Sequence, residues 1–399
     1  MMLETWLFEL LKGIGKIFLQ PLLYWIIILY IITSYRRIKR ERLQFGSKVF
    51  DMFAEAKNTL GISLVFSIIV SIFSIGFGFV FSYEMIGVLF IVTLLLSITG
   101  ALTALSSSYT LGITFLIVLI LHYANFDIFD QFRLIEDLTV VHFISLAILT
   151  GLFLLVEALL VSSQLTKTFP IVIKSERGKW VGQHQLKRLA FIPFFGFLPT
   201  EQIGGIAPLF PYFEFGEHSF SLILLPFAVG FHYKVQGDLP HRVAQKLGQA
   251  TLLLSMIVLA FAIASLFFPI LTIVAIIVAI LGKEWITFRH RLRDRKKAAY
   301  FGPVNKGLKV LAIYPNSPAE RLGIEIGEVI LKVNGVTIHS SEEFYEALQN
   351  SGPFFKLDIL DHQGEVRFLT SAFYEEDHHE LGIIFPEKPY FEERMEKTS

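Results

Sequence analysis

The chain has 399 residues, of which 53% are hydrophobic and only 18% are charged, and its formal net charge at pH 7 is zero. Soluble domains contain about 25% charged residues, whereas the apolar residues here form runs of about 20, the length that crosses a hydrocarbon core about 30 Å thick. The composition therefore excludes a purely soluble protein and indicates an integral membrane protein. The sequence has no cysteine, which excludes a disulfide framework and thiolate chemistry.

Residues 1–20 have the pattern of an amphipathic helix that lies along a membrane surface. Apolar side chains such as Leu7 and Leu11 recur at helical spacing, and Lys12 falls on another face. Pro21 predicts a break or kink directly after this helix.

Residues 21–287 are expected to form an α-helical multi-pass membrane domain of about six to eight spans. The apolar stretch Leu252–Leu281 is interrupted at Pro269, so it forms either one kinked helix or a hairpin of two helices. Residues 191–233 contain too many prolines and glycines for a regular span, and we expect them to lie at the membrane interface or to re-enter the membrane. The clearer runs are residues 22–35, 61–82, 85–105, 109–124 and 140–161.

Three basic clusters predict the orientation of the chain in the membrane. They lie in two predicted loops, residues 36–60 and 162–190, and in a predicted linker, residues 288–299. Lysine and arginine are enriched on the cytoplasmic side of membrane proteins. We therefore expect these three segments, and all residues after the linker, to be cytoplasmic.

Residues 300–389 have the composition of a compact soluble domain, followed by a charged tail at residues 390–399. Ser317-Pro318-Ala319-Glu320 has the pattern of a capped short helix, and Ser340 is placed to cap a second helix, Ser341–Gln349. Asn334-Gly335 is the dipeptide that a type I′ hairpin turn favours. The predicted strands are residues 307–314, 328–333, 354–360 and 365–373.

This order of elements resembles the bacterial type of PDZ domain found in HtrA-like proteases, most clearly at Pro315–Ala319 and Gly327–Gly335. The resemblance implies an α+β domain in which an extended peptide adds a strand beside the second helix, while loop N–H groups capture a carboxylate. The residues that this reasoning assigns to peptide binding are Tyr300, Phe301, Gly302, Leu308, Val310, Phe344, Ala347 and Leu348.

Two aspects of this site stay open in the sequence. The first candidate for the carboxylate-binding loop is Tyr300–Pro303, but Pro303 at its end lacks an N–H. Leu381-Gly382-Ile383 is therefore a second candidate. For Phe344 and Leu348, each taken alone, a place in the hydrophobic core is the simpler interpretation.

The sequence lacks the motifs of a membrane-associated protease, including the HExxH helix of a metalloprotease and the G-x-S-x-G nucleophile elbow. We expect no catalytic residue, metal or cofactor, and no nucleic-acid binding, because topology explains the basic clusters. Glu157 is the one carboxylate well inside an apolar run. It lies about one turn from the end of its predicted span, so snorkelling to the interface explains it better than a transport role. His142 is expected at the opposite interface.

As a whole, the chain resembles the MinJ family, the membrane adaptors of the Min division-site system in rod-shaped Gram-positive bacteria. The resemblance runs from the N-terminal helix, through Arg37–Arg42 and Val49–Glu55, to the C-terminal domain. It implies a non-enzymatic adaptor at septa and cell poles that links MinD to the scaffold DivIVA. Other division-machinery proteins and membrane lipid are further implied partners, and a homo-oligomer is compatible with it. The alternatives are a PDZ scaffold of a membrane protease or secretion complex, and a transporter with an accessory PDZ domain.

Overall fold

The computed structural model describes residues 2–124, 140–163, 168–176, 178–199, 220–350, 352, 354–372 and 381–392. Most of the predicted tail, and residues 200–219 of the region predicted to lie at the interface, fall outside the described residues. The helices of the first part are α1 (Met2–Lys16), α2 (Pro21–Phe45), α3 (Ala54–Gly76), α4 (Tyr83–Ile98), α5 (Ser107–Ala124), α6 (Val140–Ser162), α7 (Pro240–Ala264) and α8 (Leu271–Lys296). Two 3-10 helices, η1 (Ile17–Leu19) and η2 (Leu102–Leu105), interrupt them.

Within the described residues, four helices are long and apolar enough to cross a membrane: Thr59–Gly76 of α3, and α6, α7 and α8. A fifth candidate is the bent pair of Leu10–Leu19 and α2, which meet at 62° and confirm the kink predicted at Pro21. The expected six to eight spans are therefore reduced to four or five. The reason is that α4 and α5 are shorter apolar helices, and that part of the remaining apolar sequence forms strands.

Strands inside the membrane domain are the main departure from the expected all-helical architecture. A three-stranded antiparallel sheet has the order β1-β2-β5, formed by Phe169–Lys174, Trp180–Phe191 and Ala228–Val235. β3 (Phe194–Pro199) pairs separately with β4 (Phe220–Leu225). The segment 162–190, expected to be a basic loop, therefore contains β1 and most of β2. The described part of 191–233 is likewise strand rather than an irregular re-entrant segment.

Side chains from neighbouring helices bind the backbone groups that these strands leave unpaired. The Tyr30 hydroxyl donates to the carbonyl of Leu189, and Thr103 Oγ1 donates to the His232 carbonyl at 3.0 Å. At the other pair of strands, Gln20 Nε2 donates to the Leu224 carbonyl at 2.8 Å. Non-helical backbone is tolerated at membrane depth only where protein buries and satisfies it, so these contacts explain how a sheet can lie among the helices.

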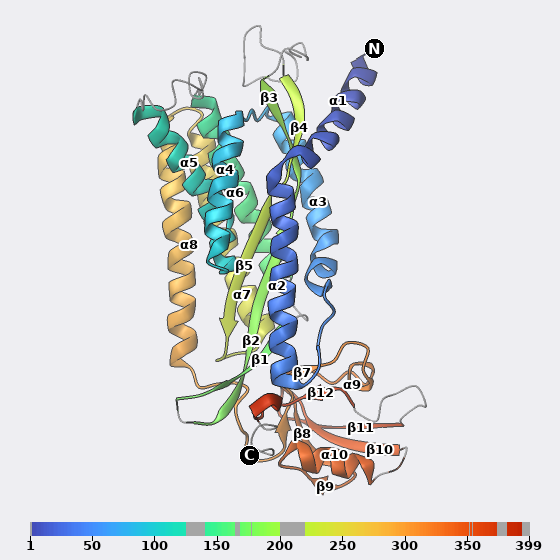
Figure 1. The fold of residues 1–399 in the computed structure, drawn as a ribbon. Helices are drawn as coiled ribbons and strands as arrows, with labels where there is room; N and C mark the ends of the chain where they lie inside the picture. The colour runs from blue at the N-terminus through green and yellow to red at the C-terminus, as the bar shows by residue number, and fades with distance from the viewer. Residues whose placement is uncertain are drawn as a thin grey trace.

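The two ends of the membrane domain differ in character. Figure 1 shows the long helices running in a common direction, with α1, β3 and β4 at one end and the C-terminal domain at the other. The basic last turns of α2 and α8 both lie at the end that carries the C-terminal domain. Most of the predicted linker 288–299 is helical, because α8 continues to Lys296. Only a short segment thus separates the two domains.

The C-terminal domain consists of small antiparallel sheets and two helices. A sheet of five strands has the order β11-β10-β8-β6 with β9 paired to β8, and β12 pairs separately with β7. The predicted strand 307–314 is split in two, because the Val310 amide bonds to Glu328 of the first sheet and the Leu311 amide to Ile384 of the second. The elements are β6 (Leu308–Lys309), β7 (Ala312–Ile313), α9 (Pro318–Arg321), β8 (Val329–Val333), β9 (Val336–Thr337), α10 (Ser341–Gln349), β10 (Phe354–Leu360), β11 (Val366–Ala372) and β12 (Ile383–Ile384).

Candidate functional site

The local structure of the C-terminal domain follows the predicted capping and turn signals. Ser317 Oγ accepts a bond from the Glu320 amide at 3.4 Å, and Pro318 occupies the first turn of α9. Ser340 caps α10 in the same way, at 3.2 Å from the Glu343 amide. Asn334 and Gly335 have φ angles of 48° and 85° between the paired strands β8 and β9, as a type I′ turn requires.

Five of the eight residues assigned to peptide binding belong to the core of this domain. Leu308, Val310, Phe344 and Leu348 are buried in one hydrophobic cluster, and Ala347 packs against it partly exposed. Phe344 and Leu348 thus occupy the core, the simpler of the two roles considered for them. Their side chains form the buried face of α10.

The segment beside α10 is the second candidate loop and the strand that follows it. Leu381 and Ile383 belong to the same cluster as Phe344, and the Tyr345 hydroxyl of α10 donates to the Ile383 carbonyl at 3.3 Å. Gly382 has a φ of +79°, and a Cβ there would meet Ser317 at 2.4 Å. This position therefore requires glycine, because the residue before β12 passes close to the N-terminal cap of α9.

The other three assigned residues connect the two domains instead of lining α10. The Gly182 amide of β2 donates to the Phe301 carbonyl at 2.7 Å, and the Tyr300 amide donates to the Gln236 carbonyl at 2.8 Å. Phe301 is fully buried in a different cluster from that of Phe344. Gly302 follows directly. The structure thus places Tyr300 and Phe301 at the contact between the domains, where Phe301 forms an isolated bridge with Gly182 of β2.

Gly182 is a junction residue that the sequence analysis missed. A Cβ at this position would lie 2.4 Å from Leu311 and 2.9 Å from Phe301. The surrounding cluster draws buried residues from both domains, including Val49, Val172 and Leu239 on one side and Leu311 and Ala312 on the other. We call this cluster, with Gly182 and Phe301, the domain joint. A glycine inside a strand is a sequence signal for such a close approach, but this segment was expected to be a loop.

His184 forms a buried polar link within the domain joint. Its Nδ1 lies 2.7 Å from Thr168 Oγ1, and its Nε2 lies 2.9 Å from the carbonyl of Leu311. A carbonyl only accepts, so Nε2 carries the proton and Nδ1 accepts from the threonine hydroxyl. Burial lowers the pKa of His184 from 6.5 to about 4, because the imidazolium would lose its hydration. The neutral ring therefore joins β2 to the C-terminal domain.

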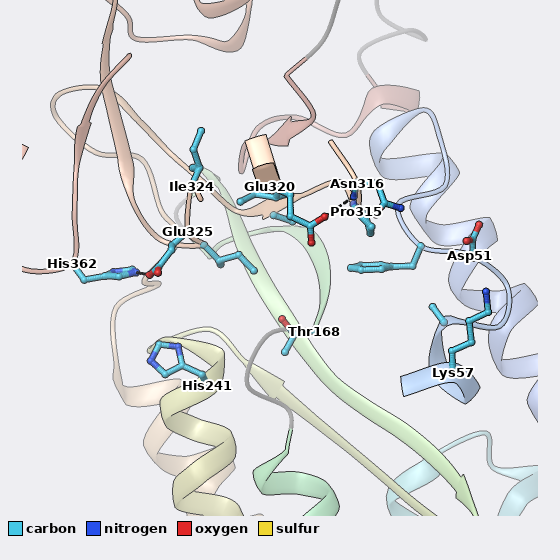
Figure 2. Close-up of a pocket in the computed structure, with 15 residues that line it drawn as sticks. Asp51, Lys57, Thr168, His241, Pro315, Asn316, Glu320, Ile324, Glu325 and His362 are labelled. Atoms are coloured by element: carbon cyan, nitrogen blue, oxygen red, sulfur yellow. Dashed lines mark hydrogen bonds and ion pairs between the residues drawn. The ribbon is translucent and has the colours of Figure 1, made fainter. Parts of the chain in front are cut away.

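A cavity of about 680 Å³ opens beside the domain joint. Figure 2 shows Asp51 and Lys57 from the membrane domain facing Glu320 across it, with His241 and His362 at the other end. Charges of both signs line it, and one pair, His362 Nε2 and Glu325 Oε2, lies 3.4 Å apart. The cavity is therefore a cleft between the domains with a mixed polar and apolar lining.

Glu157 was expected to reach the membrane interface by snorkelling, but the structure shows a different arrangement. Its side chain is fully buried and forms an ion pair with Lys283 of α8, which the sequence analysis did not single out. Ser106 Oγ donates to the second carboxylate oxygen at 2.6 Å. His142, in the first turn of α6, is also buried. The sequence signal for the ion pair was that Glu157 and Lys283 carry opposite charges in two predominantly apolar helices. Only the packing of α6 against α8 shows that they pair. We found no group of histidine, aspartate and glutamate side chains suited to a metal within the described part of the chain.

Comparison with known proteins identifies the domain and the family. A PDZ domain family model matches residues 309–354. The cell division topological determinant MinJ of Bacillus subtilis (strain 168) is 32% identical over 381 residues, which cover 95% of this chain and 96% of that protein. The chain belongs to the MinJ family. The predicted resemblance to this family and the predicted PDZ domain are both confirmed.

Shorter similarities are confined to part of the chain. A probable MinJ of Lacticaseibacillus paracasei is 31% identical over 85 residues, 21% of this chain and 23% of that protein. Human serine protease HTRA3 is 37% identical over 75 residues, 18% of this chain and 17% of the protease. A solved PDZ domain of an SdrC-like protein from Listeria monocytogenes is 18% identical, covers 21% of this chain and 90% of its own, and has a TM-score of 0.18. The B. subtilis MinJ match, which covers 95% of the chain, extends over the membrane domain.

Proposed function

We propose that this member of the MinJ family is a non-enzymatic membrane adaptor of division-site selection that links MinD to DivIVA at septa and cell poles. The observation that carries the proposal is the 32% identity, over 95% of the chain, to a protein named as a cell division topological determinant. Because that match includes the membrane domain, the proposal concerns the whole chain and not the PDZ domain alone.

The arrangement of charges supports a cytoplasmic PDZ domain. The last turns of α2 and α8 carry Arg42, Arg293 and Arg295, and both ends lie on the side of the membrane domain that carries the PDZ domain in Figure 1. Positive charge is enriched on the cytoplasmic side. A PDZ domain docked there is confined to the membrane plane, so that weak contacts with other membrane-associated proteins gain from local concentration.

We assign the peptide-binding edge to β12, which lies beside α10, and the carboxylate-binding loop to Leu381 and Gly382. Strand addition needs an edge next to the second helix, and the contact between Tyr345 and Ile383 supports this placement. The loop Tyr300–Gly302 is excluded from this assignment, because it is part of the domain joint.

The test is the location of a fluorescent fusion in dividing rods, with the full chain compared with a chain that ends at residue 299. We expect the full chain at septa and poles, and we expect the truncated chain to cause filaments or minicells. Immunoblots must show equal amounts of both proteins, since truncation exposes the buried surface around Gly182. Uniform membrane fluorescence and normal division with both chains would overturn the proposal.

A further inference from the structure

The strand edge that faces α10 is defined by the hydrogen bonds of β12. On the opposite side, the carbonyl of Gly382 accepts from the Tyr314 amide and the carbonyl of Ile384 accepts from the Leu311 amide, both at 2.8 Å. Backbone groups of successive residues in a strand point to alternate sides. The amide and carbonyl of Ile383 therefore point toward α10, where an added peptide strand would bind.

The chain's own atoms already occupy this edge. The Tyr345 hydroxyl donates a hydrogen bond to the Ile383 carbonyl, and the Glu387 amide donates to the Phe385 carbonyl at 3.0 Å. The ring of Phe385 packs edge-on against Phe344, with centroids 5.3 Å apart. A peptide that adds as a strand must supply N–H donors to these same carbonyls, so it must first displace these contacts.

The residues after β12 continue along α10 and then reach the membrane domain. We call Phe385–Glu392 the strap. Its Glu387 carboxylate accepts bonds from the Ser341 amide, at 2.9 Å, and from the Ser341 hydroxyl. Negative charge is favourable at this end of α10, where amides lack helical partners. Further along the strap, the ring of Tyr390 lies against Gly46, so closely that a Cβ there would come within 3.3 Å.

Gly46 is the left-handed residue that ends α2, with a φ of 77°. The next residue, Ser47, lies 2.9 Å from the hydroxyl of Tyr314, whose amide binds Gly382 beside β12. The end of a candidate membrane span is thus connected to the peptide edge by two routes, the strap and Tyr314. A displacement at the end of α2 would alter both routes.

We propose that the strap holds the peptide groove of the PDZ domain closed, and that the groove opens when the strap leaves α10 and Gly46. The ligand class is an extended peptide with a free C-terminal carboxylate, which takes the Ile383 edge once the strap is displaced. This inference rests on the proposed function, because it concerns the regulation of the same groove. It makes the end of α2 the element that controls peptide binding.

The experiment uses the full chain in detergent micelles and a displayed library of heptapeptides with free C-termini. Two variants release the strap: Glu387→Ala, which removes the bond to α10, and a chain that ends at Pro386. The matched control is Glu346→Ala, which removes an exposed carboxylate from the same helix. We expect the released variants to bind selected peptides at least ten-fold more tightly than the unchanged chain and the control.

A locked form tests the opposite direction. Because the sequence has no cysteine, the pair Ser341→Cys and Glu387→Cys provides two unique thiols that a short bis-maleimide can join. We expect the joined form to lose peptide binding, and the same variant capped with N-ethylmaleimide to bind like a released chain.

The possible results separate this inference from the function on which it rests. If the unchanged chain binds peptides as tightly as Glu387→Ala, or if joining the two thiols has no effect, the strap proposal is wrong while peptide binding stands. Amide hydrogen exchange shows whether the strap has left α10 in the released variants. If it has left and no form binds any peptide, both the strap proposal and the assignment of the groove are wrong.

Discussion

Lys283 of α8 and Glu157 of α6 form an ion pair in which neither side chain is exposed. The lysine ammonium also lies over the ring of Tyr233, 5.5 Å from its centroid, and Ser106 binds the second carboxylate oxygen. The pair therefore joins α6 and α8 to β5 and to the start of α5. A buried pair of this kind contributes little net stability itself, but each charge is costly once its partner is gone.

We expect Lys283→Met to destabilise the membrane domain by about 3–5 kcal/mol, because it leaves the Glu157 carboxylate buried without a counter-charge. The double variant Glu157→Leu, Lys283→Met should lose less, since it removes both charges. Thermal unfolding in detergent measures the difference. Lys246→Met is the control, since its side chain is 69% exposed. A double variant less stable than the single one would contradict this account.

Gly182→Ala should separate the PDZ domain from the membrane domain. A Cβ at this residue would lie 2.9 Å from the Cβ of Phe301, which is fixed to the backbone, so the joint must open to admit it. Trypsin should then cleave the segment after α8, around Lys296 and Lys297, several-fold faster than in the unchanged chain. Gly61→Ala in α3 is the control, because nothing lies within 4 Å of its added Cβ. Equal cleavage of the Gly182 and Gly61 variants would show that the joint is not tightly packed.

The domain joint should weaken in acid because of His184. The pKa of its ring is about 4 in the folded chain and 6.5 unfolded, so the unfolded state takes up a proton first as the pH falls. The stabilisation is complete above pH 6.5 and is lost progressively toward pH 4, by up to about 3 kcal/mol. Tryptic cleavage after α8 between pH 7.5 and pH 5 measures it. A His184→Asn variant should show a flatter pH dependence, whereas the exposed His339→Gln variant should behave as the unchanged chain.

Arg37 should be required for the connection between α2 and α3. Its guanidinium binds Glu41 at 2.9 Å and Glu55 at 3.2 Å, and it also donates to the carbonyls of Phe50 and Asp51. Lysine cannot reproduce this planar set of donors. We expect Arg37→Lys to lower the free energy of unfolding by about 2–3 kcal/mol and to expose residues 46–53 to proteases. The exposed Arg42→Lys is the control, and equal effects of the two changes would refute the assignment.

Short-range chemistry explains which parts of this fold were predictable. The caps at Ser317 and Ser340, the turn at Asn334-Gly335 and the kink at Pro21 each depend on a few consecutive residues, and the structure has all four. The identification of the PDZ domain likewise followed from local spacing. The peptide-binding residues were less predictable, because Tyr300–Gly302 and Leu381–Ile383 both match a PDZ loop and only their packing separates them.

The sequence by itself determined that the chain is a membrane protein with a terminal PDZ domain, because runs of apolar residues and turn motifs act through neighbouring positions. Only the tertiary structure decided that residues 169–174, 180–191 and 228–235 form a sheet. β2 is buried along most of its length, so it lacks the polar alternation that marks a strand with one exposed face. Its polar residues can be buried because distant groups bind them, as Leu311 does for His184. The pairing of Glu157 with Lys283 and the docking of Gly182 on Phe301 have the same origin, since each joins residues more than a hundred positions apart in the chain.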